Sequence, residues 1–196
     1  MNEKKLQVFL SRIVLFLREK YAIDVQFVDG FISVSREVAE WRNNRMIVDV
    51  RERGTLGSLF VVCHVFGHLV QHSTTRKYSD LLAIVDSRPL PLDLDNDFKS
   101  RYFPYEKEAF QIGKGLMEEV FEVDSELDRL YQIFIQTDFE HYWNYLVTGR
   151  GSSREAFNRR FRRMQKEMLQ DITVPLQSIK PPETLQGVNC IEIIVV

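Results

Sequence analysis

The stretch Thr55-Leu-Gly-Ser-Leu-Phe-Val-Val-Cys-His-Val-Phe-Gly-His-Leu-Val-Gln-His72 decides the fold that this sequence predicts. Its apolar side chains would surround a helix on nearly all sides, which is typical of a helix buried at the centre of a domain. His64, His68 and His72 follow one another at intervals of four residues. Residues four apart lie above one another on a helix, so the three imidazoles form a stripe on one face.

The first two histidines of this stripe have the spacing of a metal site. Two imidazoles one turn apart can occupy adjacent corners of a zinc tetrahedron, as they do in the motif H-E-x-x-H. A third histidine, His72, lies about 12 Å from His64 along the helix axis, too far for one ion to bridge. We therefore expect His72 to have a structural role. In H-E-x-x-H the second residue is the glutamate that serves as general base, and here that position is Val65.

A zinc site needs a third protein ligand besides His64 and His68. Two carboxylates, Glu106 and Glu108, lie in the helix expected after Pro104. Acidic residues of the preceding loop, such as Asp95, are further candidates. The spacing alone does not choose among them.

The hydrophobic pattern along the chain predicts an α+β fold, in which a small sheet is followed by a helical bundle. A β-hairpin is expected around Asp29-Gly30, because Asp-Gly is a strong signal for a two-residue turn. Thr55 is a candidate N-cap of the histidine helix, and residues 86–101 read as an irregular loop. The helices are expected at residues 3–20, 55–72, 104–121, 125–148 and 152–169, and the strands at 24–28, 31–35, 45–50 and 188–196.

Composition restricts the class of protein. Hydrophobic residues make up 44% and charged residues 28% of the 196 residues, which fits one soluble globular domain. The net charge of −2 argues against nucleic acid or a membrane as a general partner. Two cysteines provide no disulfide framework, which favours a reducing compartment. No apolar leader and no run of membrane-spanning length is evident, so we expect a cytoplasmic protein.

Taken in order, these motifs resemble the ImmA/IrrE metallopeptidases. That family shows a strand, a turn, a helix with H-E-x-G-H-L-hydrophobic-x-H, and a later helix that opens with E-x-E-A-N-x-F-A. Here the corresponding stretches are Ile47-Val-Asp-Val, His64-Val-Phe-Gly-His68-Leu-Val-Gln-His72 and Tyr105-Glu-Lys-Glu-Ala-Phe. The resemblance covers roughly residues 5 to 121. It departs at Val65, at Phe110 in place of the asparagine, and at Ile112-Gly113 in place of the following Phe-Ala.

The resemblance implies a minimal gluzincin-like domain over residues 1–121, with residues 122–196 as a helical extension and a C-terminal strand packed on the same domain. It implies a zinc ion held by His64, His68 and either Glu106 or Glu108. Family members cleave repressor proteins, but valine cannot accept the proton that the missing glutamate takes from zinc-bound water. No catalytic residue is therefore assigned. The expectation is a catalytically impaired protein that binds a regulatory protein partner, such as a repressor.

Three other interpretations remain open. An active zinc endopeptidase is possible if Glu108 or Glu119 has taken over as the base. Nucleic-acid binding is possible through the arginine-rich helix 152–169, although an ordinary amphipathic helix has the same pattern. In a purely structural protein the histidines serve packing alone, and the metal content of the purified protein distinguishes that case from a metal site.

Overall fold

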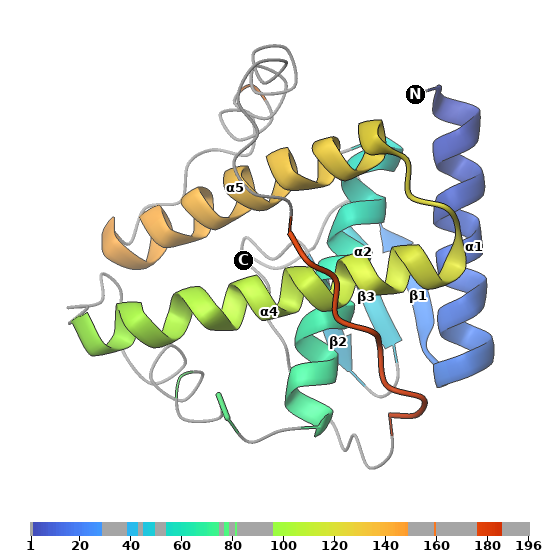
Figure 1. The fold of residues 1–196 in the computed structure, drawn as a ribbon. Coiled ribbons are helices and arrows are strands. Elements are labelled where there is room, and N and C mark those ends of the chain that lie inside the picture. The colour runs from blue at the N-terminus through green and yellow to red at the C-terminus, as the bar shows by residue number, and fades with distance from the viewer. Residues whose placement is uncertain are drawn as a thin grey trace.

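The computed structural model is mostly helical and carries one small sheet, which confirms the α+β class (Figure 1). It describes residues 2–28, 39–42, 45–49, 54–74, 77–78, 81, 96–148, 159 and 176–185. The elements in chain order are α1 (Glu3–Tyr21), β1 (Asp24–Val28), β2 (Ala39–Arg42), β3 (Arg45–Asp49), α2 (Gly54–Thr74), α4 (Asn96–Val120) and α5 (Ser125–Thr148).

The sheet has the strand order β1-β3-β2 among the described residues. Strand β1 runs parallel to β3, and β2 runs antiparallel to β3. The strand predicted at 24–28 is therefore present, and that predicted at 45–50 is present over its described part, Arg45–Asp49. Strand β2 was not predicted. The expected hairpin partner at 31–35 lies outside the described residues. A parallel β1–β3 pair requires a crossover connection, which the hairpin signal at Asp29-Gly30 could not indicate.

Helix α2 lies between the sheet and α4, so it is the centre of the fold (Figure 1). Every residue from Gly57 to Gln71 is buried, as its all-round apolar pattern predicts. Contrary to the expectation from the sequence, α2 is long and apolar enough to cross a membrane by length and composition. Most of that helix is enclosed by the rest of the protein, as is usual for a core helix.

Helix α4 begins at Asn96, eight residues before the start that the sequence predicted. Proline is common at the first position of a helix, which is why the sequence predicts a start at Pro104, but Pro104 lies inside α4. The missing backbone N–H weakens the helix there. The preceding turns are held because Phe98 and Tyr102 are buried in an aromatic cluster with Leu146 of α5. The predicted loop 86–101 is therefore wrong from Asn96 onward.

Other boundaries agree with the sequence more closely. Helix α5 has its predicted limits, and α1 is one residue longer than expected. Thr55 is not an N-cap, because α2 already begins at Gly54, which has a φ of 62°. The predicted helix 152–169, apart from the exposed Arg159, and the predicted strand 188–196 lie outside the described residues.

An extended segment, residues 176–185, crosses over α4 (Figure 1). The backbone N–H of Ile179 donates to the carbonyl of Gln111 at 3.0 Å. The ammonium of Lys114 donates to the carbonyl of Leu176 at 3.0 Å. The helix offers this segment a close approach because Gly115 has no side chain: a Cβ there would lie 2.0 Å from the carbonyl oxygen of Ile179.

Glycine also permits the close approach of α2 and α4 where they cross. A Cβ added to Gly67 would lie 2.0 Å from the backbone oxygen of Ala109, and one added to Gly113 would lie 2.6 Å from that of Cys63. These separations are far below van der Waals contact, so no other residue fits without moving the backbones apart. The two helices therefore approach as closely as backbones permit.

We predict that Gly67→Ala destabilises the protein by about 3 kcal/mol or more, measured by urea unfolding. Alanine is better than glycine in a helix by about 1 kcal/mol, but here its Cβ must push α2 away from α4. Gly54→Ala is the control, since no atom lies within 4 Å of its Cβ and only its positive φ opposes the change. That cost is about 1–2 kcal/mol. An equal or smaller loss for Gly67→Ala contradicts the prediction.

Candidate metal centre

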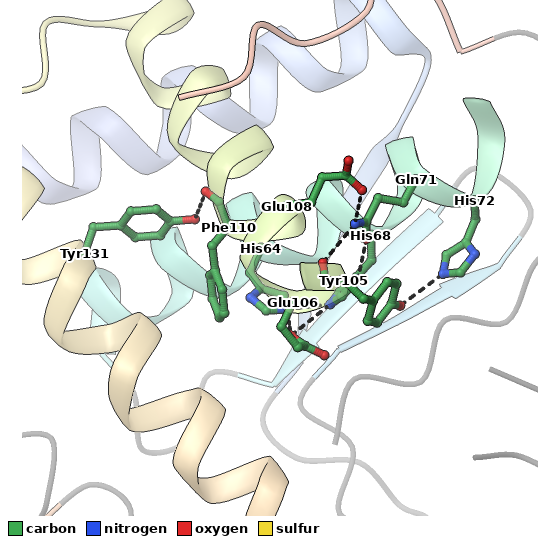
Figure 2. Close-up of polar contacts among 9 residues, drawn as sticks. All are labelled: His64, His68, Gln71, His72, Tyr105, Glu106, Glu108, Phe110 and Tyr131. Atoms are coloured by element: carbon green, nitrogen blue, oxygen red, sulfur yellow. Dashed lines mark hydrogen bonds and ion pairs between the residues drawn. The ribbon is translucent and has the colours of Figure 1, made fainter. Parts of the chain in front are cut away.

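The close helix crossing places three side chains together. His64 and His68 extend from α2 one turn apart, and Glu106 extends from α4 toward both of them (Figure 2). Gly67 lies between the two histidines in the sequence and faces Ala109, one turn after Glu106. The absence of a side chain at Gly67 thus allows α4 to bring its carboxylate over the imidazole pair.

The distances within this cluster are short. His64 Nε2 and His68 Nε2 are 2.6 Å apart. Glu106 Oε2 lies 3.4 Å from His64 Nε2 and 3.5 Å from His68 Nε2. All three residues are buried, with exposed fractions of 2%, 3% and 7% for His64, His68 and Glu106. Three electron-pair donors from two helices therefore converge on one buried point.

This donor set fits a metal ion. A neutral imidazole nitrogen and a carboxylate oxygen both offer lone pairs, so a proton or a cation must lie between them. Tetrahedral ligands about 2.1 Å from zinc are ~3.4 Å apart, which matches both distances to Glu106. The imidazole nitrogens must separate by about 0.8 Å to reach the same spacing. The described residues thus include a buried group, His64, His68 and Glu106, that can hold a metal ion.

The electrostatics favour the ligand forms of these residues. Burial, together with the neighbouring His68, lowers the pKa of His64, so that imidazole stays neutral. Burial alone raises the pKa of Glu106, but the two imidazoles outweigh it and hold the pKa below its usual range. A neutral histidine and an ionised carboxylate are the states that a metal ligand requires.

Glu108, the other carboxylate predicted as a ligand, does not join the cluster. Its Oε2 accepts a hydrogen bond of 2.9 Å from Gln71 Nε2, and its Oε1 lies 3.4 Å from Lys77 Nζ (Figure 2). Residues two apart in a helix point about 200° apart, so Glu106 and Glu108 cannot face one ion together. Asp95, the loop candidate, lies outside the described residues.

His72 also lies away from the cluster, as its distance along the helix predicts. Its Nε2 is 3.2 Å from Tyr105 Oη. Burial, with a smaller contribution from His68, lowers the pKa of His72 to about 4, so its imidazole is neutral at pH 7. His72 is therefore a packed, hydrogen-bonded residue in the described structure.

Two of the three departures from the family pattern adjoin His64, Val65 in the sequence and Phe110 in space. Val65 is fully buried within the main hydrophobic core. The ring of Phe110 lies edge-on to that of His64, with centroids 3.9 Å apart. Both positions therefore present hydrocarbon where the pattern has a carboxylate and an amide.

The sequence interpretation missed Gln71, which is buried and contacts His68. Its Oε1 is 3.0 Å from His68 Nδ1. A polar residue three positions after a candidate ligand lies on the same helix face, and that spacing was the available signal.

Comparisons with known proteins identify no relative of this chain. No protein-family model, no curated protein and no solved structure matches this chain. The feature that characterises the chain is therefore its site, a buried cluster of two histidines and one glutamate that can hold a metal ion.

We predict that the protein binds one divalent ion and that Glu106→Gln weakens this binding at least 100-fold. Glu118→Gln is the matched control, because Glu118 lies on the same helix with a side chain that is 40% exposed and pairs with Lys114, and this variant is expected to retain the affinity within a few fold. Titration calorimetry with Zn²⁺, and the visible spectrum of bound Co²⁺, measure both variants. Metal at 100 times its dissociation constant adds about 2.7 kcal/mol to the unfolding free energy. Equal affinities of the two variants contradict the assignment of Glu106.

A second prediction concerns the stability of the protein at acidic pH. The pKa of His72 is about 4 in the folded protein and about 6.5 ordinarily, so between these pH values the unfolded chain binds more protons. The free energy of unfolding therefore falls as the pH falls from 6.5 to 4. His72→Phe removes this contribution. In metal-free protein, urea unfolding at pH 7 and pH 5 should show a smaller loss for the variant, and an unchanged loss contradicts the shift.

Proposed function

We propose that this chain is an ImmA/IrrE-like metallopeptidase-type domain that binds zinc, has lost its general base, and acts by binding a regulatory protein partner. The observation that carries the proposal is the buried convergence of His64, His68 and Glu106. Two histidines and a glutamate are the protein ligands of several catalytic zinc sites, which keep the fourth position for water or substrate. Their order along the chain, with Gly67 between the histidines, is also that of the family pattern.

A zinc ion held by His64, His68 and Glu106 would supply Lewis-acid chemistry, polarising a carbonyl and making a water molecule more acidic. The protein must still supply a group that accepts the water's proton, and general-base catalysis contributes about 10²–10⁴ in rate. At the position of the family's glutamate this chain has Val65, whose isopropyl group is fully buried in the core. A hydrocarbon side chain in hydrocarbon surroundings supports the loss of peptidase activity.

The carboxylates considered as replacement bases are held elsewhere. Glu108 is bonded to Gln71 and Lys77. Glu119 lies 2.5 Å from Lys20 Nζ, and it is 13 residues, or about 20 Å, from Glu106 along α4. These contacts favour a catalytically impaired protein over an active enzyme with a relocated base.

For the alternative of an active enzyme, one buried acid is the residue to test. Asp138 of α5 is buried, and its charge acts to raise the pKa of His64. If the natural protein cleaves its partner, Asp138 is the carboxylate to test as the base.

We predict that the zinc-loaded natural protein binds a repressor partner without cutting it, whereas Val65→Glu gains cleavage. Val65→Gln is the matched control, because glutamine has the same shape and burial cost but cannot accept the proton. The three proteins are mixed with candidate repressors of the same organism, and calorimetry measures binding while gel electrophoresis measures cleavage. Urea unfolding first checks that both variants are folded.

Zinc-dependent cleavage by the natural protein that is abolished by His64→Ala overturns the impaired assignment. If Asp138→Asn also abolishes it, the chemistry has moved to that residue. Failure of all three proteins to bind any candidate contradicts the proposed partner, and an absence of zinc uptake contradicts the proposal as a whole.

A further inference from the structure

Gln71 is a buried polar side chain that connects the two helices of the candidate metal centre. It is 2% exposed and extends from α2 toward α4 (Figure 2). Its Nε2 donates to the backbone oxygen of Tyr105 at 2.9 Å and to Glu108 Oε2 at 2.9 Å. Its Oε1 lies 3.0 Å from His68 Nδ1. The amide therefore uses both N–H donors and its oxygen within the protein.

These contacts determine which way the amide points. A backbone carbonyl and a carboxylate both accept hydrogen bonds and cannot donate them, so the NH₂ group of Gln71 must face Tyr105 and Glu108. Its oxygen must then face His68. An oxygen can only accept there, so His68 Nδ1 must carry a proton. In a neutral imidazole this leaves Nε2 with a lone pair.

We infer that Gln71 is a positioning residue that presets His68 as an Nε2 metal ligand. The lone pair at Nε2 is directed at the point where His64 Nε2 and Glu106 Oε2 converge. A hydrogen bond to the second ring nitrogen fixes the tautomer and the ring orientation, and raises the basicity of the ligating nitrogen. This inference rests on the proposed metal site and assigns Gln71 a role within it.

The same arrangement gives Glu108 a role that does not involve binding the ion. One of its oxygens accepts from Gln71, and the other faces Lys77, whose side chain is 58% exposed. The carboxylate thus fixes the donor end of the Gln71 amide rather than binding the ion. A chain of contacts, Lys77–Glu108–Gln71–His68, extends from the surface to the cluster.

His64 has no equivalent partner. Its Nδ1 is buried and makes no hydrogen bond in the described structure. With His68 Nε2 unprotonated, the 2.6 Å contact between the two Nε2 atoms requires His64 Nε2 to donate in metal-free protein. His64 must lose the proton from Nε2 before that nitrogen can bind an ion, whereas His68 already presents a lone pair at its Nε2. The two histidines are therefore inequivalent.

Long-range ¹H–¹⁵N spectra of the histidine side chains in metal-free protein at pH 7.5 test the inference. We expect His68 with a protonated Nδ1 and an unprotonated Nε2 in the natural protein. In Gln71→Met, which keeps the length and burial of the side chain, this preference should be lost. The affinity for Zn²⁺ should fall about 10–100-fold.

The matched control is Gln132→Met on α5, because Gln132 Nε2 is buried without a hydrogen bond and contacts none of the cluster's nitrogens in the described structure. It should leave the His68 tautomer and the affinity unchanged. Urea unfolding places both variants on the same scale of stability, so that a general loss of folding is distinguished from loss of positioning.

A protonated Nε2 on His68 in the natural protein overturns the inference, and this measurement needs no variant to fold. An unchanged tautomer and affinity in Gln71→Met also overturn it. If the natural protein shows the expected tautomer, Gln71→Met loses it and neither binds Zn²⁺, the positioning role is supported while the proposed metal function fails.

Discussion

The approach of α2 to α4 at Gly67 is the constraint on which the site depends. A backbone oxygen occupies the space where any other residue would place its Cβ. This brings oxygen acceptors of α4 within reach of side chains on α2, so the Glu106 carboxylate contacts the histidine pair and the carbonyl of Tyr105 accepts a hydrogen bond from Gln71. Without the glycine, the helices would pack through side chains, at a separation that a carboxylate could not bridge in the same way.

Such a close crossing buries polar groups between the helices, and each of them needs a hydrogen-bond partner. Most do: Gln71 satisfies both ends of its amide, and Tyr131 donates to the carbonyl of Phe110 at 3.1 Å. The exception beside the cluster is His64 Nδ1. Burial alone would disfavour an ionised Glu106, but the two imidazoles beside it outweigh that effect and hold the pKa of the carboxyl below its usual range. The cluster is therefore a place where a carboxylate stays ionised in the interior and can hold a cation.

The sequence was sufficient for the parts of the fold that depend on local pattern. The period of apolar residues located α1, α2 and α5, and the i, i+4 spacing located His64 and His68. The sequence could not separate Glu106 from Glu108, because that choice depends on which face of α4 packs against α2. The start of α4 predicted at Pro104 is wrong, because the burial of Phe98 and Tyr102 outweighs the preference of proline for the first position of a helix. The parallel pairing of β1 with β3 was also beyond local pattern, because it is a contact between distant segments.

The extended segment 176–185 has a consequence for how the chain acquires its structure during synthesis. It binds the backbone of α4 at Gln111, its carbonyl at Leu176 accepts from Lys114, and its Pro182 carbonyl accepts from Tyr21 of α1. These contacts join residues separated by up to 161 positions. A ribosome releases α1, α2 and α4 long before it releases residue 182. During synthesis, the side of α4 at Gly115 therefore stays uncovered until residues 176–185 have emerged.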